Sequence, residues 1–463
     1  MSQALVKLRP SALLTKYFSG QSISYPQMIA LFVPLLVDQA FIVGLNLINT
    51  AMISSSGVAA VSAVNMVDSL NIFLISVFVA VATGGTVVVA QYKGSGNNSM
   101  VSKSAAGTIS SVSVLSVGIG LLLAVFHMPA LNILFGSAAP DVFDNARVYL
   151  IGSSVSYLGI GIVEAVCGAL RGIGRSRASL FLSLIMNLSY VLLNILFING
   201  MHMGVMGLSV ALNVSRYLAA ICSIYYLIKV DTNLHLKIKD MIHVNWTMFK
   251  KIMFIGMPFA AEQMFFNGGK ILTQIFIVGL GTNAIAVNAI CATLANVVQI
   301  PANALSLTVI TVVGQCIGSR SIEDARKFTK SFLWLSSLSF IFTGAIVLSL
   351  FNPLVAMFHP PGEIIDDIFA VMLMNTLVQI PLWSLSFITP SALRAAGDSK
   401  FTSMVSMLSM WLFRVVLGYI LGVLSPLGIL GVWLAMDLEW GIRGFIFLRR
   451  FSGEKWYQHK LID

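Results

Sequence analysis

Long apolar stretches recur along the whole sequence, and they restrict the possible folds more than any other feature. Each is near or above the roughly 20 residues that an α-helix needs to cross the hydrocarbon core of a bilayer, and well beyond a barrel strand. Only 10% of the residues are charged, against about 25% in an average soluble domain. The sequence therefore predicts an all-α polytopic membrane protein. The twelve stretches lie at about 27–52, 62–90, 104–126, 147–168, 178–198, 205–228, 252–277, 284–314, 331–351, 368–390, 401–424 and 428–448.

The 28 Lys and Arg residues divide unequally between the two sides of the predicted membrane. If the spans alternate in direction, 23 of them fall in loops on one side and one, Arg147, on the other. Because cytoplasmic loops are enriched in Lys and Arg, we expect a multi-pass protein of the cell (inner) membrane with both termini in the cytoplasm. The net charge of +10 then reflects topology and not a nucleic-acid partner. The other four basic residues lie within spans: Arg216, Lys270, Arg414 and Arg443.

The sequence carries no pattern typical of a catalytic, metal or nucleotide site. The four cysteines form no CxxC, the six histidines show no i, i+4 pairing, and no GxxxxGK[ST] motif occurs. We therefore expect a protein that is not an enzyme, with no catalytic residues, no bound metal, no cofactor and no ATP. The oligomeric state stays open.

An internal repeat divides the chain into two halves of six spans. Because six is even, both halves insert in the same orientation, which predicts a parallel repeat about an axis along the membrane normal. We expect an N-terminal lobe at 1–228, a cytoplasmic linker at 229–251 and a C-terminal lobe at 252–463. Four landmarks recur at a separation of 223 or 224 residues: PLLVDQ (34–39) and PFAAEQ (258–263), Gln91 and Gln315, ALRxxG (169–174) and ALRxxG (392–397), and GxxG (204–207) and GxxG (428–431).

The repeated loop motifs carry a family resemblance that covers essentially the whole chain. ALRGIGRS (169–176) and ALRAAGDS (392–399) resemble the LRGxGD loops of the MATE (multidrug and toxic compound extrusion) family, and the segment 411–422 resembles its eleventh helix, which carries an Arg. An acid four residues after the proline of the first helix, here Asp38 after Pro34, resembles the pattern of the DinF-like bacterial branch of the MOP flippase superfamily. The resemblance implies a twelve-helix, two-lobed antiporter that exports organic cations or other amphipathic compounds and is driven by inward H⁺ or Na⁺.

Three departures from that family favour H⁺ over Na⁺ as the coupling ion. Many members have an Asp late in the first helix, where this chain has Asn49, and an Asp in the fifth helix, where it has Asn194. NorM-like members carry an acid in the tenth helix, whereas 368–390 contains none. These losses make Asp38 the leading candidate for proton coupling.

Six acids lie within the predicted spans, where a charge costs about 2.5–3.5 kcal/mol to insert. Asp38 and Pro34 share a helix face, because they are four residues apart, and burial would raise the proton affinity of the carboxyl group. A helix–helix hydrogen bond is the alternative role. Asp68, expected near the external mouth, is a weaker candidate. Asn49 and Asn194 are also weaker candidates, for the substrate cavity or a charge network. The six acids are Asp38, Asp68, Glu164, Glu262, Asp437 and Glu439.

Glu262 occupies in the second half the position that Asp38 has in the first. One interpretation is that Glu262 binds a cationic substrate or a second proton, and that the nearby charge of Lys270 tunes this binding. The alternative is that Glu262 and Lys270 form a buried charge network that stabilises the C-terminal lobe. Glu439 and Arg443 are spaced i, i+4 and are expected to form a structural pair. Asp437 and Arg414 are a second candidate pair, between the last two spans.

These features favour a secondary active efflux transporter in which substrate binds between two lobes and access alternates. The expected partners are the lipid bilayer and a small amphipathic or cationic substrate, because the spans hold six acids against four bases. A lipid-linked oligosaccharide flippase of the same superfamily is the alternative, and a passive channel or receptor is a third class.

Overall fold

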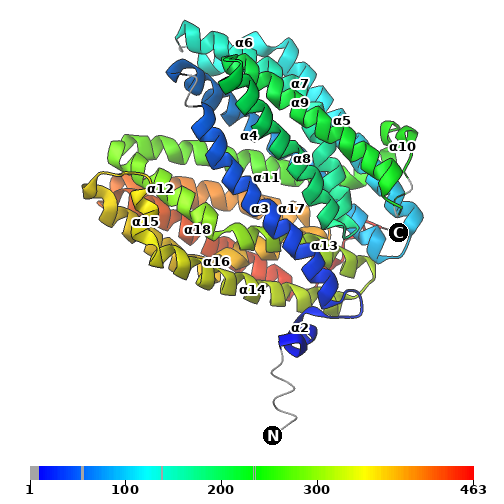
Figure 1. Cartoon of the computed structure of the whole chain (residues 1–463). Coiled ribbons are helices and arrows are strands. Elements are labelled where there is room, and N and C mark those ends of the chain that lie inside the picture. Colours follow the sequence, from blue (N-terminus) through cyan, green and yellow to red (C-terminus); the bar gives the residue numbers. More distant parts are fainter. Residues whose placement is uncertain (1–9, 54–56, 137–138, 233, 235, 463) are drawn as a thin grey trace. The chain divides into compact units, whose positions relative to one another are not determined.

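The computed structural model describes residues 10–53, 57–136, 139–232, 234 and 236–462. The described chain is helical almost throughout and shows no β-strand (Figure 1). The first half contains six long helical passes, of which the fifth and sixth end in π-helical turns. These are α3 (Tyr25–Ile53), α4 (Val58–Gly94), α5 (Asn98–Val125), α7 (Pro140–Gly172), α8 (Ser176–Asn194) with η2 (Ile195–Gly200), and α9 (Gly204–Tyr225) with η3 (Tyr226–Val230).

The second half repeats this order. Its passes are α11 (Trp246–Gly279), α12 (Thr282–Val298) followed by α13 (Ile300–Gly318), α14 (Ile322–Ser349), α16 (Ile365–Ala395), α17 (Ser399–Ser409) with η5 (Met410–Leu417) and η6 (Ile420–Leu424), and α18 (Gly428–Ser452). Four short helices connect or flank the passes: α2 (Pro10–Phe18), α6 (His127–Phe135), α10 (Ile238–Ile242) and α15 (Phe351–Ala356).

The twelve predicted spans correspond to twelve helical passes. Ten described helices are long and apolar enough to cross a membrane. The seventh and twelfth passes, α11 and α18, are as long but carry buried charged residues. The predicted eighth span is broken at Gln299, so that α12 and α13 share it; Pro301 lies in the first turn of α13, where its missing N–H costs little.

The internal repeat is visible in the backbone as well as in the sequence. Four described glycines of the first half have a positive φ. Three of them pair with a second-half glycine of similar angle, whereas the fourth, Gly96 (75°), corresponds to Arg320 (60°). This conformation disfavours any residue with a Cβ, which explains why glycine stands at both copies of the three pairs. The pairs are Gly57 (φ 93°) with Gly281 (103°), Gly174 (90°) with Gly397 (101°), and Gly204 (54°) with Gly428 (56°).

The helices pack as two compact units, residues 41–260 and residues 1–40 with 261–463. Each boundary falls inside a helix that contains a proline, α3 or α11. The units therefore differ from the predicted lobes, because the first part of α3 belongs to the C-terminal unit and the first part of α11 to the N-terminal unit. Both units have their own apolar core, around Val67 and Leu150 in one and around Phe328 and Trp383 in the other.

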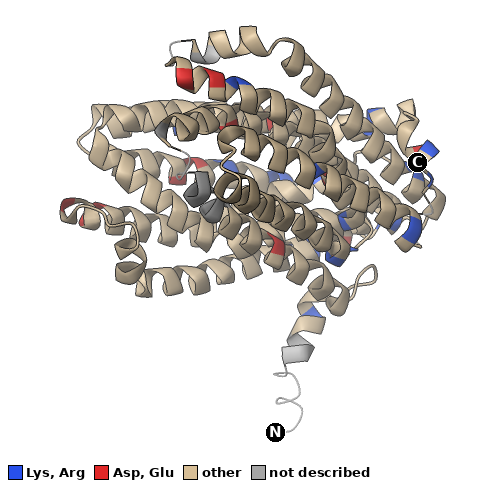
Figure 2. Ribbon diagram, turned by 45° about the horizontal axis from the view of Figure 1, so that its top comes forward, with Lys and Arg blue, Asp and Glu red and all other residues tan. Residues whose placement is uncertain are grey.

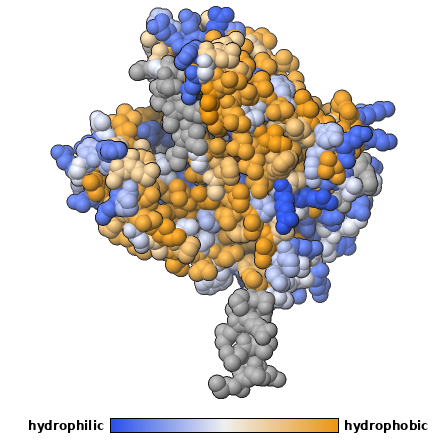
Figure 3. All heavy atoms as spheres, viewed as in Figure 1, coloured by the Kyte–Doolittle hydropathy of each residue, from blue (hydrophilic) through white to orange (hydrophobic). Residues whose placement is uncertain are grey.

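Large apolar side chains are exposed on the surfaces of both units, as expected for helices that face lipid. Trp334 is 79% exposed, Phe342 68% and Leu192 67%. Apolar residues cover much of the visible face (Figure 3). Charged residues are sparse along the helices (Figure 2).

Within the N-terminal unit, helices α4 and α11 cross closely at Gly84 of α4. A Cβ placed on Gly84 would lie 2.7 Å from the carbonyl oxygen of Ile252 and 2.8 Å from the backbone nitrogen of Gly256, both in α11. Small residues let helix backbones approach in this way, and close packing is a main source of helix association in lipid.

We predict that Gly84→Ala lowers the unfolding free energy by about 1–3 kcal/mol, because the methyl group would push two backbones apart. The measurement is the thermal midpoint of the purified protein in detergent. Gly118→Ala is the matched control, since nothing lies within 4 Å of its Cβ position; its midpoint should stay the same or rise. Equal midpoints for both variants would contradict the close crossing.

Candidate functional site

The C-terminal unit contains a cavity of about 400 Å³ between α11, α12, α16 and α18. This volume is in the range of small-molecule sites. Besides aliphatic residues and the side chains of Thr273 and Met436, the lining contains an aromatic wall, a set of amides and two cations. The aromatic residues are Phe266, Trp383, Phe387, Trp433 and Trp440, the amides are Gln274, Asn288, Asn296, Gln299 and Asn303, and the cations are Lys270 and Arg414.

Lys270 is the cavity cation whose side chain is exposed. Its ammonium lies 4.9 Å from the centre of the Phe266 ring. Among the described residues, no carboxylate lies within ion-pair distance of it. Arg414 is buried, and its guanidinium lies 5.0 Å from the Phe266 ring and 5.9 Å from the Trp440 ring. The aromatic wall therefore borders both positive charges.

Behind the cavity, Glu439 is fully buried and bound by two arginines. Its Oε2 accepts a hydrogen bond from Arg414 at 3.1 Å, and its Oε1 lies 3.2 Å from Arg443 and accepts from Ser409 at 3.0 Å. The predicted i, i+4 pair of Glu439 and Arg443 is confirmed. The predicted pairing of Asp437 with Arg414 is wrong, because Asp437 accepts a hydrogen bond from Asn375 at 2.8 Å while Arg414 binds Glu439.

Glu262 forms a second buried ion pair, and its partner is Arg394 rather than Lys270. One nitrogen of Arg394 donates to both carboxylate oxygens at 2.7 and 2.8 Å, and Ser403 donates at 3.0 Å. The predicted network between Glu262 and Lys270 is thus replaced by a pair between α11 and α16. Arg394, which the sequence placed in a cytoplasmic loop, is 6% exposed and lies in the last turn of α16.

Asp38 lies in α3, four residues after Pro34, and is 6% exposed. The expected burial of this carboxyl group is thereby confirmed. The position belongs to the part of α3 that packs with the C-terminal unit. Asn49 was another predicted cavity residue; its side chain lies outside the described residues.

The N-terminal unit gathers its polar side chains around Asp68 of α4. Tyr149 donates to Asp68 at 2.8 Å and Asn71 donates at 3.2 Å, while Tyr157 donates to Asn71 at 2.7 Å. Both tyrosines lie in α7, and on this helix the hydroxyl of Ser156 accepts a hydrogen bond from Arg216 at 2.7 Å. Two further candidates lie elsewhere in this unit: Asn194 is 1% exposed, and Glu164 lies 3.9 Å from Arg171.

Sequence reasoning missed most of the partners in these clusters. Tyr149 and Tyr157 are spaced by eight residues, about two helical turns, so both reach α4 from α7. Two tyrosines at this spacing in an apolar helix share one face, so the sequence could have identified them as candidate hydrogen-bond donors to a neighbouring helix. Arg394 could have been identified only by recognising that its motif continues the tenth span.

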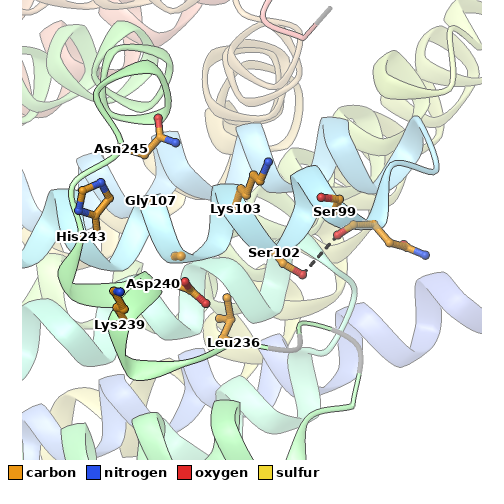
Figure 4. A pocket seen from close by; sticks show the side chains of 11 residues that line it. Ser99, Ser102, Lys103, Gly107, Leu236, Lys239, Asp240, His243 and Asn245 are labelled. Carbon is orange, nitrogen blue, oxygen red and sulfur yellow. Dashed lines mark hydrogen bonds between the residues drawn. The ribbon is translucent and has the colours of Figure 1, made fainter.

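A second cavity, of about 760 Å³, lies beside the start of α5 and the segment around α10 (Figure 4). Lys103 reaches it from α5, and Lys239, Asp240 and His243 reach it from the linker. Asp240 accepts a hydrogen bond from the backbone of Lys237 at 3.2 Å. The polar lining and the position in the predicted linker are typical of a solvated loop surface.

Comparison with known proteins now bears on this arrangement. The MatE family model matches residues 34–198 and again residues 258–420. Its two matches begin 224 residues apart, at Pro34 and Pro258, which confirms the internal repeat. The chain belongs to the MATE family. It is therefore a multi-pass membrane transporter and not an enzyme, and several of its relatives are named as multidrug resistance proteins.

Individual relatives align with this chain over nearly its full length and theirs. The uncharacterized transporter YisQ of Bacillus subtilis (strain 168) is 24% identical over 96% of this chain and 96% of its own. The probable multidrug resistance protein NorM of Thermotoga maritima is 24% identical over 94% of each chain.

Solved structures show the same fold at low identity. An outward-facing multidrug resistance MATE transporter of the MOP superfamily matches with a TM-score of 0.84 and 17% identity, over 92% of this chain and 95% of its own. A MOP superfamily transporter from Pyrococcus furiosus, for which a reverse polarity of the binding pocket suggests a different function, matches with a TM-score of 0.81 and 18% identity over the same shares.

We predict that Glu262→Gln lowers the unfolding free energy by about 3–5 kcal/mol, because Arg394 would become an uncompensated buried charge. Thermal unfolding of the purified protein measures this. Glu363→Gln, at an exposed acid, is the control and should change little.

The double variant Glu262→Met with Arg394→Met should recover most of the stability, since replacing both members of a buried pair by apolar residues costs little. A double variant no more stable than Glu262→Gln alone would show that the ion pair is not the cause.

Proposed function

We propose that this protein is a proton-coupled secondary active exporter of small amphipathic compounds, with Asp38 as the coupling residue. The observation that carries the proposal is a buried carboxyl group one turn after a proline in a membrane-spanning helix of a MATE transporter. Buried acids in membrane spans are costly and commonly mark ion pathways. Proton uptake removes the charge, and the neutral group favours a different packing of α3.

The two buried glutamates, Glu262 and Glu439, are less suited to proton exchange than Asp38. Glu262 is bound by Arg394, and Glu439 by Arg414 and Arg443. Protonation of either glutamate would leave a buried guanidinium without its counter-ion, which costs several kcal/mol. We therefore assign these two glutamates a structural role and not a role in proton coupling. H⁺ remains the proposed coupling ion in preference to Na⁺.

The cargo is proposed to enter the 400 Å³ cavity of the C-terminal unit. Its aromatic wall and amides fit a compact ring-containing molecule. The predicted organic-cation cargo depended on six acids against four bases in the spans. Arg394, in the last turn of α16, adds a fifth base to the four in the spans, and Glu262 and Glu439 are already bound by arginines, so that count no longer favours a cation at this cavity.

The alternative, a lipid-linked oligosaccharide flippase, requires space for a sugar chain and a pyrophosphate. The cavity volume and its aromatic wall favour a small compound. Export of a fluorescent drug from cells, with no effect on oligosaccharide translocation, would separate the two functions.

We also propose that the protein lies in the inner membrane with both termini in the cytoplasm, as the unequal distribution of Lys and Arg indicates. Lys237→Cys should then resist a membrane-impermeant thiol reagent in intact cells, whereas Asp366→Cys, in the exposed first turn of α16 on the predicted external side, should react. The native cysteines are buried or half-buried. Reaction at residue 237 and protection at 366 would reverse the topology.

We predict that Asp38→Asn abolishes export driven by a pH gradient, because an amide cannot take up and release a proton. Insertion and folding should persist, since a neutral amide is less costly to bury than a carboxylate. Asp38→Glu should keep partial activity. The measurement is substrate uptake into everted vesicles under separately imposed pH and Na⁺ gradients.

The matched control is Asp366→Asn, at an exposed acid of α16, which should transport normally. Normal proton-driven uptake by Asp38→Asn would locate the coupling residue elsewhere. Uptake driven by Na⁺ alone would overturn the choice of ion.

A further inference from the structure

The charge of the C-terminal cavity is positive. Lys270 and Arg414 line it, and among the described residues that line it none is acidic. Glu439 compensates only one of the two arginines that it contacts. Asp437 does not line the cavity and is held by Asn375. A cationic ligand would meet the ammonium of Lys270 and find no open carboxylate, so the charge distribution opposes it.

Two of the five lining amides, Asn288 and Gln274, already use their side-chain oxygens as hydrogen-bond acceptors. Trp433 donates to the side-chain oxygen of Asn288 at 3.1 Å, and Asn288 donates to that of Gln274 at 3.2 Å. In the described part of the chain, Nε1 of Trp440 and Nε of Arg414 have no acceptor. The ammonium of Lys270 adds three further donors. A ligand that supplies negative charge and acceptor oxygens would satisfy the exposed ammonium of Lys270.

The aromatic residues define the rest of the ligand. Trp383 and Phe387 are stacked, with ring centres 4.5 Å apart, and Trp440 contacts Phe387 edge-on at 6.0 Å. Rings of this kind give large apolar contact area and preferred stacking geometries for another ring. Phe266 lies beside both cations and links the apolar wall to the charged end.

We propose that this cavity binds aromatic organic anions, with the carboxylate on Lys270 and the ring against Trp383, Phe387 and Trp440. As a binding site, the cavity stands on the geometry alone; as the cargo site, it rests on the proposed function. Arg414, fixed by Glu439, contributes positive potential next to the carboxylate. The proposal reverses the substrate charge expected from the count of residues in the spans.

The binding experiment uses three probes with the same ring system: 2-naphthoate (anion), 2-naphthamide (neutral) and 2-naphthylmethylammonium (cation). Each is titrated into the purified full-length protein in lipid nanodiscs, and the dissociation constant is measured by calorimetry. We expect naphthoate to bind at least about tenfold more tightly than the amide, because hydrogen bonds to charged groups are the strong ones. The ammonium probe should bind most weakly.

Variants then connect the preference to one side chain. Lys270→Gln should remove the preference for naphthoate and leave binding of the amide nearly unchanged, whereas Lys270→Arg should retain it. Lys330→Gln, at an exposed lysine of α14, is the control and should match the parent protein. Thermal unfolding of each variant verifies that the protein is folded. Tighter binding of the cation, or a preference for naphthoate that survives in Lys270→Gln, would overturn the proposal.

Transport separates this inference from the proposed function. Uptake of labelled naphthoate into everted vesicles under a pH gradient, lost in Lys270→Gln, supports both. Naphthoate binding without transport of any probe would refute the exporter and keep the site. Proton-driven uptake of the cation alone, together with a loss of naphthoate binding, would keep the exporter and refute the anion site.

Discussion

The cost of placing charge in a low-dielectric environment governs the interior of this protein. Every strongly buried arginine of the C-terminal unit has a named anionic or hydroxyl partner: Arg394 with Glu262, Arg414 with Glu439, and Arg443 with Glu439 and Ser386. Such pairs contribute little net stability compared with apolar packing, but they are costly to break. They connect α11 with α16, and α18 with η5 and α16, because their partners lie on these elements. The cavity of this unit lies among the helices that these pairs hold.

Hydropathy and repetition predict the architecture because both are properties of long segments. An apolar stretch of more than 20 residues has few alternatives to a membrane helix, and the constant separation of PLLVDQ and PFAAEQ requires a duplicated unit. The break between α12 and α13 was missed, since Gln299 and Pro301 interrupt hydropathy too briefly. The division of α3 and α11 between packing units also lies beyond sequence, because it depends on which neighbours each half of a helix meets.

The candidate site was predicted unevenly for a physical reason. Spacing along one helix determines which residues share a face, so the Glu439–Arg443 pair followed from i, i+4 geometry. Glu262 and Arg394 are 132 residues apart, and nothing local relates them. Lys270 was singled out from the sequence as a cation within a span, and in the structure its expected partner Glu262 is bound by Arg394 instead. A count of charges over all spans does not describe one cavity, because charge compensation there depends on which side chains are neighbours.

The uncompensated ammonium of Lys270 has an electrical consequence for the cell. Moving one elementary charge through the membrane is worth about 2.3 kcal/mol per 100 mV. When a monovalent cation leaves for each entering proton, the exchange carries no net current. When a monovalent anion leaves instead, both movements carry current in the same direction, and a potential negative inside favours each of them. Under the proposed exchange of H⁺ for an anion bound at Lys270, the concentration gradient that the transporter can sustain would rise steeply with membrane potential, whereas exchange for a monovalent cation would be independent of it.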